Sequence, residues 1–348
     1  MAAGLWLALD HTARTSAGKV GDAVEARVAG GVGEIVLVGN SISGKALDGD
    51  ALGARLGVTV TDLAVDGTLP AHWYAVLKSY VFGRGARPRL VVLYANPGAM
   101  TTTRLEEDAQ QAAFAMLEGA DDPVVASRAF PDGASLAAIR ARAGARYVLR
   151  DAVTDLVVHG AVGVGEPRGR DGLLSAGRER LRRAEAVVFG VMPEDRKPKP
   201  AAATGPAPEP VKVSESLLPA LAELCEAHGA RLVLAFAATH PKQRRKCGDP
   251  GTLQPGFGDL AAGGPVDLLR LDTLDVPARM FADSFHLRGR GEALVTEATA
   301  IAMLRSGVAR AAPTAPGTSW SWPCEDPPAI EVAEGDTGVA RKKPKPRR

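Results

Sequence analysis

Short apolar runs alternate along much of this chain with segments in which apolar residues recur at helical spacing. The runs have strand length, and a glycine or a polar residue follows each of them within three positions; they are residues 34–38, 58–65, 90–94, 231–236 and 266–271. Segments with helical spacing lie at 46–56, 70–82, 214–228 and 292–304. Strands that alternate with helices are typical of βαβ units, in which the strands are parallel. The pattern therefore predicts a three-layer α/β/α fold around a parallel sheet of about five strands.

Two stretches interrupt this pattern and define the expected domain organisation. Residues 103–190 are helical in pattern and rich in Ala and Arg, so we expect a helical insertion that packs on the sheet. Residues 194–212 are rich in Pro and Ala and carry almost no large apolar side chain, which is typical of a flexible linker. We expect a helical lead-in at 1–32, one α/β domain at 33–308, and a disordered basic tail at 309–348.

Composition adds few constraints on partners. The chain has 348 residues and a formal net charge of +2, which gives no reason to expect a nucleic-acid partner. None of the three cysteines forms a C-x-x-C pair, and no His, Asp or Glu cluster has metal-ligand spacing, so we expect no metal and no cofactor. Cys225 reads as a core residue. Cys247 and Cys324 lie in loop-like segments, and whether they pair stays open.

The first residues leave the cell location open. The apolar run 2–9 has no basic region before it and is too short to span a bilayer, so we expect no complete signal peptide. A membrane tether through a missing N-terminal segment is an open alternative. We therefore weigh an extracytoplasmic or periplasmic location against a cytoplasmic one, and the sequence does not predict the oligomeric state.

Chemically useful residues stand where predicted strands end. Ser41 follows the first strand, Gly67 the second and Asn96 the third, and the pair Asp283 and His286 lies just before the last helix. In parallel sheets the functional side chains gather at the carboxyl ends of the strands. Because each residue alone is ordinary turn chemistry, the informative feature is their common placement.

Together these residues supply the parts of a serine hydrolase. A serine hydroxyl is a weak nucleophile that needs a base, and histidine oriented by a carboxylate is such a base. Asp283 and His286, three residues apart, would present both side chains on one side of a short helical turn. Donors for the oxyanion would be the backbone N–H groups of Ser41 and Gly67 and the side-chain amide of Asn96.

The set resembles the SGNH (GDSL-like) hydrolase family, which is named for Ser, Gly, Asn and His in four sequence blocks. Gly39-Asn40-Ser41 resembles the first block, Gly67 the second-block glycine, Asn96 the third-block asparagine, and residues 283–287 the last block. The resemblance implies a flavodoxin-like strand order, a Ser41–His286–Asp283 triad, and hydrolysis or transfer of acyl groups, acetyl in particular. It extends loosely to bacterial proteins of cell-envelope polysaccharide acetylation, which implies a small-molecule or saccharide ester as substrate.

Two alternatives stay open. The third block usually reads G-x-N-D, and here it is Tyr94-Ala95-Asn96-Pro97, which leaves room for an inactive binding domain on the same fold. Residues 39–46 also approach the phosphate-loop pattern G-x-x-x-x-G-K-S/T, which would bind a nucleotide. Ala46 stands where that loop needs a hydroxyl for magnesium, so we expect Lys45 to point to solvent or to a surface carboxylate. The other histidines rank below His286; of these, His72 on a predicted helix and His240 at the end of a strand could line the pocket around Ser41.

Overall fold

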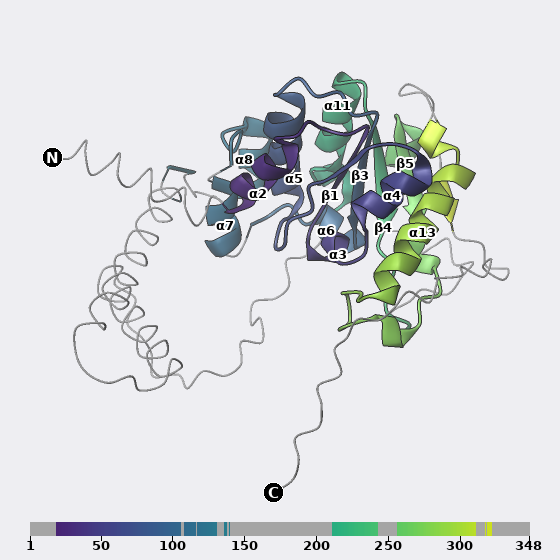
Figure 1. The fold of residues 1–348 in the computed structure, drawn as a ribbon. Coiled ribbons are helices and arrows are strands. Elements are labelled where there is room, and N and C mark those ends of the chain that lie inside the picture. Colours follow the sequence, from purple (N-terminus) through teal and green to yellow (C-terminus); the bar gives the residue numbers. More distant parts are fainter. Residues whose placement is uncertain are drawn as a thin grey trace, which may run out of the picture.

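A computed structural model describes residues 19–105, 108–115, 117–130, 136, 137, 139, 211–242, 256–310, 317 and 319–321. Five parallel strands form the body of one sheet in the order β2-β1-β3-β4-β5, and a short sixth strand, β6, extends it beyond β5 (Figure 1). The strands are β1 Ile35–Gly39, β2 Val60–Asp62, β3 Leu90–Ala95, β4 Arg231–Phe236, β5 Val266–Arg270 and β6 Ser319–Ser321. This confirms the predicted parallel α/β fold and its flavodoxin-like strand order.

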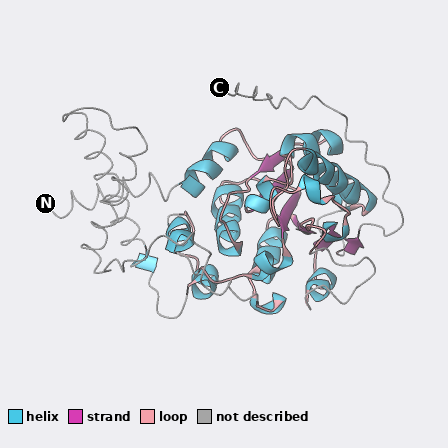
Figure 2. Ribbon diagram, turned by 90° about the horizontal axis from the view of Figure 1, so that it is seen from below, coloured by secondary structure: helices cyan, strands magenta, loops and turns pink. Residues whose placement is uncertain are grey.

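Helices cover both faces of the sheet (Figure 2). The α-helices are α2 Lys19–Val28, α3 Ser41–Gly44, α4 Gly49–Leu56, α5 Pro70–Ala75, α6 Pro97–Thr101, α7 Asp108–Ala115, α8 Pro123–Ala129, α11 Leu218–Ala227, α12 Phe257–Ala262 and α13 Arg290–Arg305. A π-helix, η1, spans Val76–Phe82, and 3₁₀ turns lie at η3 Val213–Glu215, η5 Leu271–Thr273, η6 Ala278–Met280 and η7 Val308–Arg310.

The buried strands divide their side chains between two apolar cores, as alternation along a strand requires. Val91 and Leu93 of β3 face a core shared with α2, α5, α8 and α11, whereas Leu90 and Val92 face a core shared with α4 and α13. Every residue of β1, β3, β4 and β5 is buried, which explains why these strands read as continuous apolar runs.

Several boundaries differ from the predicted ones. The second strand is only three residues long, and the predicted helix at 70–82 divides into α5 and the π-helix η1. Residues 41–44, expected as a loop, form the single helical turn α3. In the segment 309–348, for which no regular structure is predicted, Ser319–Ser321 pair with β5 as β6. Gly317 is needed just before it, because a Cβ there would lie 2.1 Å from the Val266 carbonyl oxygen.

The expected lead-in, insertion and linker are covered only in part. The described portion of the lead-in is helix α2, and the described portion of 103–190 includes α7 and α8, whose Phe114 and Val125 join the core of the sheet. The rest of the insertion, most of the linker, Cys247 and Cys324 lie outside the described residues. None of the helices that the structure describes combines the length and hydropathy of a membrane span.

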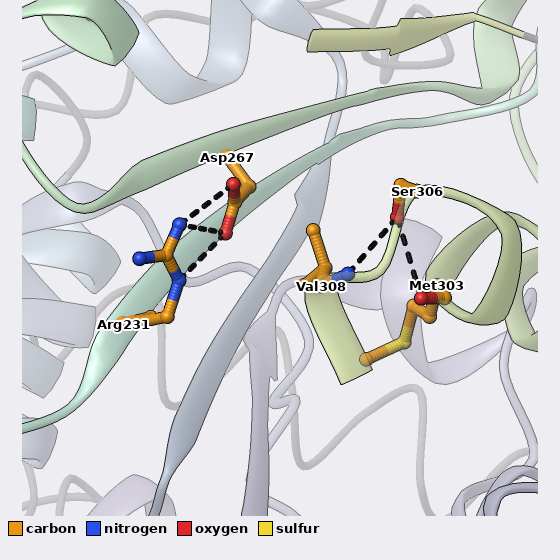
Figure 3. A network of polar contacts seen from close by, with 5 residues as sticks. All are labelled: Arg231, Asp267, Met303, Ser306 and Val308. Carbon is orange, nitrogen blue, oxygen red and sulfur yellow. Dashed lines mark hydrogen bonds and ion pairs between the residues drawn. The ribbon is translucent and has the colours of Figure 1, made fainter. Parts of the chain in front are cut away.

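A buried ion pair ties β4 to β5 at their amino ends (Figure 3). Arg231 and Asp267 have no exposed side-chain surface. Arg231 donates from Nε to Oδ2 at 3.0 Å and from Nη2 to Oδ1 at 2.9 Å. The two parallel hydrogen bonds satisfy a carboxylate that would otherwise be costly to bury.

Candidate active site

Ser41 is presented by a single helical turn at the end of β1. The strand ends at Gly39, and α3 begins two residues later. Asn40 caps this turn, because its side-chain oxygen accepts a hydrogen bond from the backbone N–H of Ile42 at 3.0 Å. Gly39 is required by close approach: a Cβ there would lie 2.5 Å from the Ser43 Cβ and 2.7 Å from the Tyr94 carbonyl oxygen. The turn therefore sits directly on the strand ends.

His286 and Asp283 lie in a tight loop closed by an antiparallel bridge between Phe281 and Leu287. Across the loop, the backbone N–H of Ala282 donates to the His286 carbonyl at 2.7 Å. The Asp283 oxygen Oδ1 accepts from the backbone N–H groups of Phe285 at 2.8 Å and His286 at 2.9 Å. The expected helical turn at this point is therefore wrong: the carboxylate itself holds the bend.

The three side chains form a continuous line of hydrogen bonds. Ser41 Oγ lies 2.9 Å from His286 Nε2, although the two residues are 245 positions apart. On the other side of the ring, His286 Nδ1 lies 2.8 Å from Asp283 Oδ2. A carboxylate accepts only, so it fixes the proton on Nδ1 and leaves the Nε2 lone pair facing the serine hydroxyl. This is the arrangement that lets an imidazole remove the serine proton.

Hydrogen bonds favour the charged form of Asp283, which is also exposed to solvent. The backbone N–H of Phe285, the His286 ring and the backbone N–H of His286 lower the pKa of the Asp283 carboxyl to about 2. Its side chain is 55% exposed and that of His286 is 32% exposed. Asp283 is therefore an anion at any pH near neutrality, and the pair is open to solvent and to a ligand.

Gly67 and Asn96 end at the same edge of the sheet as Ser41. Gly67 has φ +75°, which favours glycine, and lies in a turn whose Val65 N–H donates to the Gly39 carbonyl at 3.1 Å. Asn96 directly follows β3 and precedes α6; it is half-buried, and its side chain makes no capping hydrogen bond. Within the described part of the chain, no partner occupies the N–H groups of Ser41 and Gly67 or the Asn96 amide. In the described residues, all three predicted donors are therefore unpaired.

The structure assigns a role in positioning to Thr68, which sequence reasoning missed. Its hydroxyl donates to the Gly39 carbonyl at 2.9 Å and accepts from the indole N–H of Trp73 at 2.9 Å. The Gly67 turn is thereby fixed to the end of β1. The sequence around Thr68 does not indicate this role, because its partner Gly39 is 29 residues away in sequence.

The two departures in the third block have structural reasons. Tyr94 is fully buried, and its hydroxyl accepts a hydrogen bond from the backbone N–H of Ala238 at 3.0 Å, which joins the end of β3 to the loop after β4. Burial raises the pKa of this phenol well above its usual range. Pro97 occupies the first position of α6, where its missing N–H costs nothing.

The backbone of residues 41–44 differs from that of a phosphate-binding loop. Residues 41–44 form a helical turn, whereas that motif needs an open loop of N–H groups around a phosphate. Lys45 is exposed, and Ala46 is buried. The exposure of Lys45 agrees with the expectation that this side chain points to solvent.

The prediction that His72 lines the pocket is wrong. This residue is completely buried, and its Nδ1 accepts from the backbone N–H of Leu69 at 3.3 Å, with Nε2 3.1 Å from the Gln110 carbonyl. Burial lowers its pKa to about 4, so it is a neutral link between α5 and α7. His240 is half-buried in the loop after β4, at the carboxyl edge of the sheet. In the described ranges, no three His, Cys, Asp or Glu side chains are grouped to hold a metal ion.

Together these features define an α/β protein of flavodoxin-like, SGNH-like topology with a Ser–His–Asp line of hydrogen bonds at the carboxyl edge of its sheet. No protein-family model matches the sequence, and a search of curated proteins finds no significant relative. Topology alone assigns no family, so function has to be argued from the site.

Proposed function

We propose that this protein is a serine hydrolase or acyltransferase that acts on acyl esters, acetyl esters in particular, through an acyl-enzyme on Ser41. The observation that carries the proposal is the 2.9 Å contact between Ser41 Oγ and His286 Nε2, with Asp283 on the far nitrogen. Two segments that are 245 positions apart in sequence meet in a geometry that can activate a serine hydroxyl.

The proposed reaction uses these contacts. As Ser41 Oγ bonds to the ester carbonyl carbon, its proton passes to His286 Nε2, and Asp283 stabilises the imidazolium that forms. The carbonyl oxygen becomes an anion, for which the N–H groups of Ser41 and Gly67 and the Asn96 amide are the proposed donors. The C–O bond to the alcohol then breaks, and His286 returns the proton to the departing alkoxide oxygen.

A second nucleophile completes the cycle. Water, or the hydroxyl of another alcohol, gives its proton to His286 as its oxygen attacks the acyl carbon. The bond from that carbon to Ser41 Oγ then breaks, His286 returns the proton to Oγ, and the free acid or a new ester is released. Saccharide esters are the proposed natural substrates, on the strength of the sequence resemblance, and both outcomes use the same three side chains.

Hydrolysis of a simple activated ester tests the proposal. We expect the purified protein to hydrolyse p-nitrophenyl acetate, and Ser41→Ala to lower kcat by at least about a thousandfold. Ser43→Ala is the matched control, because Ser43 lies on the same helical turn and its buried hydroxyl has no hydrogen-bond partner among the described residues. A folded wild-type protein without turnover would favour the inactive binding domain, and equal loss in both variants would contradict the role of Ser41 as the nucleophile.

A further inference from the structure

A second histidine lies at the same edge of the sheet as the proposed triad. His240 is in the loop that follows β4, and its ring packs edge-on against Phe281 with 5.2 Å between ring centroids. Phe281 forms the bridge that closes the loop of Asp283 and His286. His240 is therefore one ring contact away from the base of that loop.

The loop that carries His240 is firmly held. The N–H of Ala237 donates to the Ala95 carbonyl at 3.0 Å, and the N–H of Ala238 donates to the Tyr94 hydroxyl at 3.0 Å. The Thr239 hydroxyl lies 3.5 Å from the Asp272 carbonyl. Three successive residues thus fix the backbone just before the imidazole, so the position of the ring is preorganised.

Within the described residues, His240 uses one ring nitrogen, Nδ1, and has no partner at the other. The backbone N–H of Lys242 donates to Nδ1 at 3.3 Å, so Nδ1 is the acceptor and the neutral ring carries its proton on Nε2. Among the residues that the structure describes, no partner accepts this Nε2 proton. A half-buried, fixed donor at the functional edge suits an oxygen of a ligand.

We infer that His240 is a specificity-determining residue of the proposed esterase site, where its Nε2–H donates to a hydroxyl oxygen on the alcohol part of the substrate. The inference rests on the proposed function. It names the substrate class as esters of polyhydroxylated alcohols, and it separates them from esters of simple alkyl alcohols. His240 takes no proton in the reaction and acts through binding.

A pair of matched esters tests this inference. Glycerol monoacetate and propyl acetate share the acetyl group and the three-carbon chain and differ only in two hydroxyl groups. We expect the protein to prefer glycerol monoacetate, and His240→Phe to lower its kcat/KM about five- to tenfold through KM, the size of one lost neutral hydrogen bond. Turnover of propyl acetate should stay the same, because phenylalanine keeps the packing on Phe281. His240→Gln, which restores a donor, should recover part of the loss.

Equilibrium binding separates this inference from the proposed function. Glycerol monoacetate is titrated by NMR into the full-length Ser41→Ala protein, with and without His240→Phe, and we expect the second change to weaken binding about five- to tenfold. If the wild type hydrolyses neither ester, the proposed function fails, and this titration still decides the role of His240. Undetectable binding, unchanged binding, or equal kinetic losses for both esters in His240→Phe would overturn the inference.

Discussion

Asp283 holds its loop and its histidine with the same carboxylate. One oxygen accepts two backbone N–H groups, and the other faces His286 Nδ1 at 2.8 Å. The two tasks are separable, because the amide oxygen of an asparagine can also accept the backbone hydrogen bonds.

We therefore expect Asp283→Asn to keep the fold and lose most activity. The asparagine amide would face Nδ1 with donors instead of acceptors, which favours the tautomer that carries its proton on the wrong nitrogen. The kcat for p-nitrophenyl acetate should fall by roughly two to four orders of magnitude at an unchanged melting temperature. Asp259→Asn, at an exposed position on α12, is the control. Activity within a factor of three of the wild type in Asp283→Asn would refute this role.

At the scale of single residues, the sequence is informative where residue type and order carry the chemistry. Ser41, Asp283 and His286 are recognisable because few side chains can be a nucleophile, a base and an orienting carboxylate. Asn40, Thr68 and Tyr94 are not, because their roles depend on backbone partners that folding brings near. His72 misleads for the same reason: nothing local shows that α7 covers it.

Strands β4 and β5 depend on an ion pair from which water is excluded. Arg231 and Asp267 are both completely buried, and each would leave an uncompensated charge if the other were removed. We expect Asp267→Asn to lower the free energy of unfolding by about 3 kcal/mol, measured by urea denaturation. Glu297→Gln, which breaks the partly exposed pair with Arg55, should cost less than about 1 kcal/mol. Equal effects would contradict the importance of burial.

At the scale of elements, continuous burial decides what can be predicted. The bounds of β4 match the predicted run, because all six of its residues are buried and all but Arg231 are apolar. The strand β6 could not be predicted from the sequence, because Ser-Trp-Ser contains no apolar run. It is a strand through its pairing with the edge of β5. The helical turn α3 is too short to have a period of its own, and it depends on the Asn40 cap.

The stability of the whole molecule should depend on pH through His72. In the folded protein its pKa is about 4, below the value near 6.5 that is usual for an unfolded chain. Between these values the unfolded chain binds a proton that the folded chain does not, so stability is lost as pH falls from about 6.5 to about 4.

We expect this loss to be on the order of 3 kcal/mol, since each pKa unit corresponds to about 1.4 kcal/mol. The measurement is urea denaturation at pH 7 and at pH 4, for the wild type and for His72→Gln. The variant should be less stable at pH 7 but should lose less stability on acidification. Identical pH dependence in the two proteins would argue against a buried, neutral His72.

The molecule as a whole joins two remote parts of the chain at one edge of a parallel sheet. Ser41 comes from the first crossover and His286 from the loop before the last long helix, and the strand order places both at the carboxyl edge. The alternation of strands and helices predicts this edge. The distances between side chains come only from the folded structure.

Covalent labelling of Ser41 tests the central claim most directly. The purified protein is treated with a fluorophosphonate, and the modified peptide is identified by mass spectrometry. We predict one adduct, on Ser41, that is lost in Ser41→Ala, strongly slowed in His286→Ala and retained in Ser43→Ala. A folded protein that takes up no label while it hydrolyses no ester, or one that is labelled equally well without Ser41, would contradict the account.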